Sequence, residues 1–145
     1  MVTVALLKEA SAGVLNDLNG LMSELREGQS DLKSASLDDL ELILANENIA
    51  MVVAMDGEHV VGVASLFILQ KLGKRIADVE DVVVSNAYRG QGIGQKIMEE
   101  ILAVARVRGV ESVGLTSRPA RVAGNKLYQK LGFTQKETNV YRLKL

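Results

Sequence analysis

One short segment combines an arginine with three alternate glycines, and it lies between an apolar run and a helical pattern of apolar residues. Arg89 is followed by Gly90, Gly92 and Gly94, shortly after the apolar run 82–84. A strand that turns sharply into a helix presents unpaired backbone N–H groups at the positive end of the helix, which suits a phosphate group. Glycine lets the backbone turn and approach a ligand without a Cβ, and arginine adds a permanent cation. The segment therefore predicts a phosphate-binding loop.

Two common phosphate-binding loops do not fit this spacing. A dinucleotide fingerprint needs a glycine three positions after Gly92, where this chain has Gln95. A Walker-type loop needs Gly-Lys-Ser/Thr, but Gly94 is followed by Gln95 and Lys96. The pattern that does fit is Arg-x-x-Gly-x-Gly, with the arginine at Arg89. A tight strand-to-helix connection without a ligand is the remaining alternative.

A second informative segment is 124–133, which reads Gly-Asn-Lys-Leu-Tyr-Gln-Lys-Leu-Gly-Phe. Leu127 and Leu131 are one helical turn apart and should face the core. Tyr128 is rotated away from that apolar stripe, so its phenol can reach a site at the edge of a sheet. The plainer alternative is a packed tyrosine whose hydroxyl lies at the surface.

Composition narrows the class of protein. The chain has 145 residues, a net charge of −1, no cysteine and a single histidine. This length predicts one domain over residues 1–145. The absence of cysteine excludes disulfides, thiolate metal sites and a cysteinyl-acyl intermediate, and His59 alone cannot form a multi-histidine metal centre. Nothing in the charge balance suggests a nucleic-acid surface.

No targeting or membrane segment is expected. Residues 1–8 alternate like a strand, unlike the basic and apolar regions of a signal peptide. No run approaches the roughly 20 apolar residues that are needed to span a bilayer. The sequence therefore predicts a cytoplasmic protein that does not bind membranes.

Hydrophobic periodicity and turn residues predict a mixture of strands and helices in the order βααβββαβαβ. We expect strands at 2–7, 49–55, 59–69, 75–84, 110–115 (buried), 133–135 and 139–145. We also expect four helices. The first begins at a Ser11 cap and stops at Gly28, and the second opens at a Ser36 capping box. The third runs from the glycine loop to Gly109, and the fourth covers 120–131 with Pro119 in its first turn.

The two motifs and this element order resemble the GNAT family of N-acetyltransferases. The loop matches the acyl-coenzyme A signature Arg/Gln-x-x-Gly-x-Gly/Ala of that family, and the end of the second motif matches its Leu-Tyr-x-x-Leu-Gly-Phe. The resemblance implies an α/β (α+β) fold, namely the GNAT acyl-CoA N-acyltransferase fold, whose mixed and largely antiparallel central sheet is flanked by helices. It also implies acetyl-CoA as cosubstrate, with no metal.

The resemblance further implies where acetyl-CoA binds. Backbone N–H groups of the loop would hold the pyrophosphate, the strand before the loop would pair with the pantetheine arm, and one strand N–H would polarise the thioester carbonyl. The residues expected to bind the cosubstrate are Val82, Val83, Val84, Arg89, Gly90, Gln91, Gly92, Ile93, Gly94, Gln95, Asn125 and Tyr128.

Tyr128 is the candidate general acid for the departing thiolate. Two neighbours depart from the family pattern, because Arg121 stands where asparagine is frequent and Gly124 stands where alanine is frequent. Gly124 costs the helix roughly 1 kcal/mol relative to alanine, and it either admits the ligand closely or has no such role. Asn125 either donates a hydrogen bond to the ligand or is a solvated helix residue.

An amine attacks only when it is unprotonated, so the reaction needs a base. Glu80 and Asp81 come directly before the valine run, and strand alternation places Glu80 with Val82 and Val84 on one face and Asp81 on the other. Some family members use a strand glutamate as base, and partial burial would raise the pKa of such a carboxyl. Glu80 is therefore the candidate catalytic base. A relay water, Asp81 as the base, or an ion pair of either carboxylate with Arg75 or Lys74 remains an alternative.

The expected function is transfer of an acetyl group from acetyl-CoA to a primary amine by direct attack in a ternary complex. The acceptor would be a small-molecule or peptide amine, and the protein a monomer or a homodimer. A non-catalytic acyl-CoA sensor and a module that binds another phosphate ligand are the alternatives.

Overall fold

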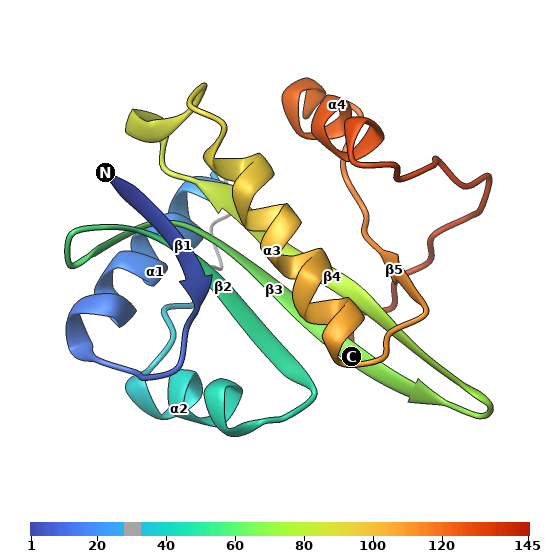
Figure 1. The fold of residues 1–145 in the computed structure, drawn as a ribbon, viewed down its shortest axis with the longest axis horizontal. Coiled ribbons are helices and arrows are strands. Elements are labelled where there is room, and N and C mark those ends of the chain that lie inside the picture. Colours follow the sequence, from blue (N-terminus) through green and yellow to red (C-terminus); the bar gives the residue numbers. More distant parts are fainter. Residues whose placement is uncertain (28–32) are drawn as a thin grey trace. The chain divides into compact units, whose positions relative to one another are not determined.

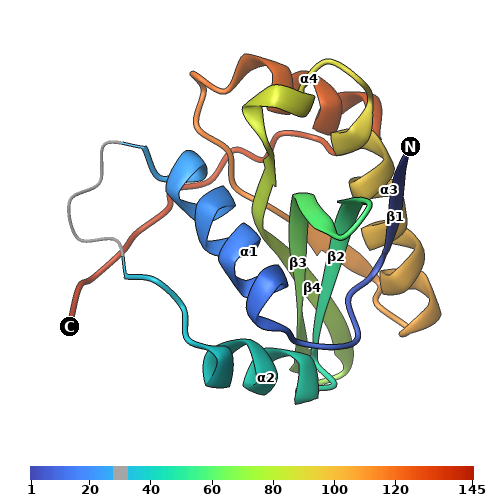
Figure 2. The ribbon, with the colours of Figure 1, turned by 90° about the vertical axis from the view of Figure 1, so that its left-hand side faces the viewer.

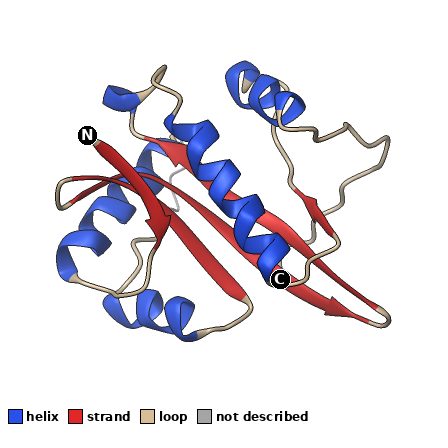
Figure 3. Ribbon diagram, viewed as in Figure 1, coloured by secondary structure: helices blue, strands red, loops and turns tan. Residues whose placement is uncertain are grey.

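The computed structural model describes residues 1–27 and 33–145, and it divides into two compact units, 1–115 and 116–145 (Figure 1). The expected helix stop at Gly28 lies outside the described residues. In the described residues, the first unit contains a five-stranded sheet and three α-helices, and the second contains one α-helix (Figure 3). No helix in the described part of the chain is long and apolar enough to cross a membrane.

The strands of the sheet lie in sequence order. They are β1 (Val2–Leu6), β2 (Ile49–Asp56), β3 (His59–Lys71), β4 (Lys74–Val84) and β5 (Ser112–Gly114). Neighbours from β1 to β4 are antiparallel, and β5 is parallel to β4. The expected mixed and largely antiparallel sheet is thereby confirmed. Two-residue turns join β2 to β3 and β3 to β4, because Gly57 and Gly73 supply the positive φ angles that such tight hairpins need.

Helices cover both faces of the sheet. Helices α1 (Ala12–Leu25) and α2 (Leu37–Ala45) lie on one face, and α3 (Ile93–Val107) lies on the other (Figure 2). Both predicted caps are confirmed. The Ser11 hydroxyl accepts the Val14 N–H at 3.2 Å, and Ser36 forms a capping box with Asp39.

The apolar stripes of these helices pack on alternate residues of the strands. The core on the side of α1 and α2 consists of Leu18, Leu21, Leu40, Met51, Val53, Val60, Val63 and Val83. On the other face Gly62 lets α3 approach, since a Cβ there would lie 2.8 Å from Ile97 Cδ1. Ile97, Met98 and Ile101 of α3 are fully buried. This packing fixes both β4 and the start of α3.

Three of the strand predictions are wrong. The strand at 110–115 is shorter than expected and is not buried, because β5 is an edge strand and Ser112 and Gly114 are exposed. Residues 133–135 and 139–145 form no strand, and Val140, Tyr141 and Leu143 are exposed. Alternation specifies which face of a strand is apolar, but a strand also needs a neighbour with which to pair.

The second unit contains α4 (Val122–Lys130). Pro119 lies in a turn that precedes this helix rather than in its first turn, because the Arg121 N–H already donates to the Arg118 carbonyl at 3.0 Å. Gly132 ends the helix as predicted, with φ 99°.

Candidate active site

The edge of β4 that faces β5 is paired along only part of its length. Strand β5 pairs with β4 from Ile76 to Asp78, and β4 then continues to Val84 with no further register to β5. An unpaired strand edge offers backbone N–H and C=O groups to a ligand. The end of β4 is therefore a place where an extended molecule can pair with the sheet.

Strand β4 contains a β-bulge next to this open edge. Val63 and Ser65 of β3 lie opposite Val83 and Glu80 of β4, so the single residue Ala64 faces both Asp81 and Val82. Asp81 has φ 55°, a left-handed conformation that aspartate adopts more readily than most residues. Such bulges increase strand twist and redirect side chains next to functional sites.

The bulge overturns the expected placement of the two carboxylates. Alternation put Glu80 on the face of Val82 and Val84, but the extra residue changes the phase, so Glu80 shares a face with Val83. That face is the one that α1 and α2 cover. Asp81 also reaches toward α1 rather than to the opposite side. The two carboxylates therefore lie on the same side of the sheet.

The environments of these carboxylates differ. Asp81 Oδ1 accepts a hydrogen bond from Nη2 of Arg26, the C-cap of α1, at 3.4 Å. This partner is neither Arg75 nor Lys74, because both of those residues lie at the start of β4. Glu80 is exposed rather than partly buried as the sequence predicted. Glu80 is thus accessible to an acceptor, whereas Asp81 takes part in a structural ion pair.

The backbone of the last residues of β4 faces alternately toward β3 and toward the open edge. Ser85 N–H donates to the Val61 carbonyl at 2.8 Å, so the backbone of Val83 also faces β3 and that of Val84 faces the open edge. Val82 is one of the two residues of the bulge, so this alternation does not extend to it. Of the three valines that were expected to contact acetyl-CoA, Val84 therefore presents its backbone there, while Val83 belongs to the core.

The loop that follows β4 turns through two left-handed glycines. Gly90 and Gly92 both have φ 76°, whereas Gly94 is already helical. Gly92 is the N-cap of α3 and has no side chain to occupy the helix terminus. Its carbonyl accepts the first intrahelical bond, from Lys96 N–H at 3.2 Å. The N–H groups of the first helical residues thus precede the hydrogen-bonded ladder and point out of the helix.

Charge at this helix terminus also favours an anion. The first turn of α3 contains no acidic residue, so the helix dipole there is not offset by a carboxylate. Arg89 Nε donates to the Val84 carbonyl at 3.1 Å, which anchors the guanidinium at the end of β4. Gly90, Gln91 and Gly92 are exposed. Ile93 is buried and fixes the direction of the helix terminus.

Tyr128 is half-buried in the second unit. Its ring contacts Phe133 edge to face, with a centroid separation of 6.0 Å. Burial raises the pKa of the Tyr128 phenol, although the nearby Arg121 acts in the opposite direction. The phenol therefore remains protonated at neutral pH, which is the state that a general acid needs.

The helix neighbours of Tyr128 have contacts of their own. Asn125 Nδ2 donates to the carbonyls of Arg118 and Arg121 at 3.0 and 2.9 Å, so the amide stabilises the start of α4. Gly124 faces the Tyr128 ring, because a Cβ built there would lie 3.6 Å from Tyr128 Cε2. This separation is an ordinary contact, so an alanine would fit.

Replacing Gly124 with alanine should therefore raise the stability of α4. Glycine within a helix costs about 0.5–1 kcal/mol relative to alanine, so the free energy of unfolding should rise by about that amount. Gly132→Ala is the opposite control, because φ 99° at Gly132 is unfavourable for alanine. Thermal melts followed by circular dichroism would test both variants, and a lower melting temperature for Gly124→Ala would contradict this assignment.

Among residues 1–27 and 33–145, no group of three or more histidine, aspartate or glutamate side chains is arranged to hold a metal ion. His59, at the β2–β3 turn, is exposed, and its Nδ1 lies 3.3 Å from Oδ2 of Asp17 in α1. In the first unit the candidate site consists of the open edge of β4, the start of α3 and the exposed Glu80, and Tyr128 belongs to the second unit.

Comparison with known proteins identifies the family. The sequence model of the acetyltransferase (GNAT) family matches residues 18–133. The chain therefore belongs to the GNAT family.

Two curated relatives are both named as glucosamine 6-phosphate N-acetyltransferases. Glucosamine 6-phosphate N-acetyltransferase from Trypanosoma brucei brucei is 36% identical over 82 residues, which are 54% of this chain and 54% of that protein. Probable glucosamine 6-phosphate N-acetyltransferase 2 from Oryza sativa subsp. japonica is 33% identical over 136 residues, which are 92% of this chain and 74% of that protein. The chain thus spans about half the length of the first relative and about three quarters of the second.

A solved structure has the same fold over the whole chain. The crystal structure of an acetyltransferase from Trypanosoma brucei aligns with a TM-score of 0.79 and 27% sequence identity, and the alignment covers 100% of both chains. The GNAT fold expected from the sequence is confirmed, with the differences in strands described above.

Sequence reasoning missed the contacts that hold the candidate site together. Arg26 meets Asp81 across 55 positions of sequence, and Tyr88 meets Asp56 across 32. Glu24 Oε2 accepts the Asn86 N–H at 3.2 Å, also from a distant element. The residues that neighbour these partners in the sequence do not indicate that such pairs form. The only sequence signal for the bulge is an aspartate, which tolerates a positive φ, within a valine-rich strand.

Proposed function

We propose that this protein transfers the acetyl group of acetyl-CoA to a primary amine. The observation that carries this proposal is that two binding features adjoin one another. The open edge of β4 is followed within a few residues by the N-terminus of α3, which no side chain caps. An extended thioester arm suits the strand edge, and a pyrophosphate suits the helix terminus. Coenzyme A joins both groups in one molecule.

In this proposal the backbone N–H groups from Gln91 to Gln95 hold the pyrophosphate, and Arg89 adds a positive charge. The backbone of Val82 and Val84 pairs with the pantetheine arm. An N–H of β4 beside the bulge then polarises the thioester carbonyl and stabilises the negative charge that develops on its oxygen. The edge of β4 beyond its pairing with β5 and the start of α3 support these roles.

The chemical step in this proposal is a direct transfer. The acceptor ammonium loses a proton to Glu80, either directly or through water, and the free amine attacks the thioester carbon. The C–N bond forms, the nitrogen of the tetrahedral intermediate loses its second proton to solvent, the C–S bond breaks, and Tyr128 supplies a proton to the departing sulfur. The proton taken by Glu80 returns to solvent, and the Tyr128 phenolate is reprotonated from solvent.

The acceptor in this proposal is a small-molecule or peptide amine, and amino sugars are the first class to test. Two relatives that match the chain are named glucosamine 6-phosphate N-acetyltransferases. Glu80 is exposed on the side of the sheet covered by α1 and α2, so an acceptor would approach from that side.

Calorimetric titration with acetyl-CoA tests the proposal, with ATP and NAD as parallel controls. Selective binding with a Kd in the micromolar range, which is about −8 kcal/mol, would support the acyl-CoA site. An acetylation assay with glucosamine 6-phosphate, glucosamine and a lysine peptide would then identify the acceptor class. No binding, or equal binding of all three ligands, would refute the proposed function.

Tyr128→Phe should lower kcat by about tenfold, which is less than a full general-acid effect. The reason is that a thiol has an ordinary pKa of about 8.5, so a thiolate leaves without complete protonation. Burial raises the pKa of the Tyr128 phenol from its ordinary value. In the wild type the fall in kcat due to loss of the Tyr128 proton should therefore lie in the alkaline range, well above neutral pH, and the phenylalanine variant should lack it. A wild-type decline centred at neutral pH that Tyr128→Phe removes would contradict this role.

A further inference from the structure

The short 3₁₀ helix η1 (Asn86–Tyr88) joins β4 to the glycine loop and is anchored at both of its ends. At its start the Asn86 N–H donates to Glu24 Oε2 of α1 at 3.2 Å. At its end the Tyr88 hydroxyl donates to Asp56 Oδ2 at 2.6 Å. Arg89 follows directly and is bound to the Val84 carbonyl. Side-chain contacts from three different elements thus fix the entrance to the loop.

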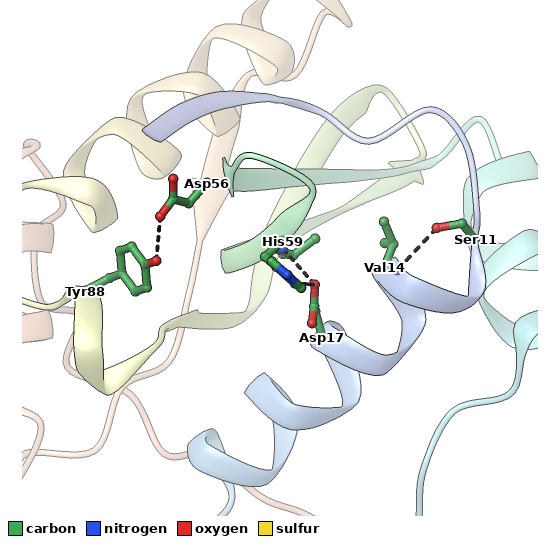
Figure 4. Close-up of polar contacts among 7 residues, drawn as sticks. Ser11, Val14, Asp17, Asp56, His59 and Tyr88 are labelled. Atoms are coloured by element: carbon green, nitrogen blue, oxygen red, sulfur yellow. Dashed lines mark hydrogen bonds and ion pairs between the residues drawn. The ribbon is translucent and has the colours of Figure 1, made fainter. Parts of the chain in front are cut away.

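The contact between Tyr88 and Asp56 is the shortest of these anchors (Figure 4). It is half-buried, and its acceptor is a carboxylate, so it belongs to the stronger class of hydrogen bonds. The hydrogen bond to Asp56 raises the pKa of the Tyr88 phenol. The phenol therefore remains a donor throughout the neutral range.

The acceptor of this bond is itself held in place. Asp56 is the last residue of β2, at the tight hairpin that leads into β3. Asp17 of α1 binds the other side of that hairpin, because its Oδ2 accepts the Val60 N–H at 2.9 Å and lies 3.3 Å from His59 Nδ1 (Figure 4). Tyr88 is thus attached to a hairpin that α1 also holds.

The loop after Tyr88 has little to hold its shape by itself. Gly90 and Gly92 have positive φ angles and nothing within 4 Å of an ideal Cβ. Glycine also loses more conformational entropy on ordering than any other residue. One end of the loop is fixed by the buried Ile93 of α3. The other end depends on η1, so the anchor at Tyr88 limits how freely the glycines move.

We propose that the Tyr88–Asp56 hydrogen bond is a positioning contact that preorganises the loop from Arg89 to Gly94 for the pyrophosphate of acetyl-CoA. This inference rests on the function proposed above. Tyr88 acts through the loop backbone and not on the reacting atoms. Its loss should therefore weaken cosubstrate binding, because the ordering of the loop must then occur on binding, while the chemical step should proceed at its usual rate once acetyl-CoA is bound.

Four variants test this role by calorimetry with coenzyme A and by kinetics with acetyl-CoA. Tyr88→Phe and Asp56→Ala should each raise the Kd for coenzyme A about tenfold, the change expected for one lost hydrogen bond to a charged group, with kcat within twofold of wild type. Asp56→Asn should recover most of the affinity, because its amide oxygen still accepts from Tyr88. His59→Gln is the matched control, because it removes a contact of the same hairpin without touching Tyr88, and it should bind normally.

Hydrogen exchange of the ligand-free protein gives a readout that does not depend on activity. Amides from Arg89 to Gly92 should exchange faster in Tyr88→Phe than in wild type, whereas His59→Gln should match wild type there. Unchanged affinity and exchange in Tyr88→Phe would overturn the inference while leaving the proposed function intact. Equal weakening by His59→Gln, or a fall in kcat without a change in affinity, would also overturn it. If wild-type protein binds no coenzyme A, the proposed function and this inference both fail.

Discussion

Replacing Gly92 with glutamate is expected to raise the Kd for acetyl-CoA by at least about 100-fold, or about 2.7 kcal/mol. Two effects combine at this position. Gly92 has φ 76° as the N-cap of α3, and a residue with a Cβ is strained there by about 1–2 kcal/mol. In addition, the new carboxylate would occupy the positive helix terminus where the pyrophosphate should bind, and it would repel that anion.

Gly73→Glu is the matched control for this variant. Gly73 has φ 78° and, like Gly92, has nothing within 4 Å of an ideal Cβ. It lies in the turn between β3 and β4, at the opposite end of β4 from the glycine loop. The control introduces the same charge and a similar strain, and it should leave the Kd unchanged. Calorimetry of both variants separates strain from loss of the anion site, and a Gly92→Glu protein that binds within tenfold of wild type would contradict the assignment of the loop.

The features that the sequence predicts well are those with local causes. The Ser11 and Ser36 caps depend on residues within three positions, and both hairpin turns depend on the conformational freedom of one glycine. The glycine loop is of the same kind, since Arg89 and the glycines are contiguous. The glycine loop can therefore be located from the sequence without knowledge of the rest of the fold.

The orientation of the two carboxylates could not be predicted, because it depends on one extra residue in β4. Regular alternation places Glu80 and Asp81 on opposite faces, but it holds only for an uninterrupted strand. The bulge arises where β3 offers one residue to two of β4. That mismatch involves residues far apart in sequence, so neither strand reveals it alone.

The prediction of strands at 133–135 and 139–145 was wrong for a related reason. The alternation of polar and apolar residues at 139–145 is genuine, yet Val140, Tyr141 and Leu143 are exposed and unpaired in the described structure. Periodicity indicates that a segment could pair, but a partner strand must also be present. The contacts of Tyr88 with Asp56 and of Arg26 with Asp81 were missed likewise, since each joins elements that only the fold brings together.

The other large effect is expected for Glu80→Gln, which should lower kcat by about 10²–10³-fold, within the range for loss of a general base. Glutamine keeps the size of the side chain but cannot accept a proton. Because Glu80 is exposed, stability should change by no more than about 0.5 kcal/mol. The Kd for acetyl-CoA should not change, because the loop and the open edge of β4 are untouched.

Asp81→Asn provides the adjacent comparison. It makes the same carboxylate-to-amide change, and asparagine tolerates the positive φ that Asp81 adopts. Asp81 is already bound to Arg26, so this substitution should affect stability more than kcat. Steady-state kinetics with the same acceptor amine would compare kcat in the two variants. The loss of kcat should appear in Glu80→Gln and be absent from Asp81→Asn. A Glu80→Gln enzyme with kcat within threefold of wild type would leave proton removal to Asp81 or to solvent, and a selective loss in Asp81→Asn would assign it to Asp81.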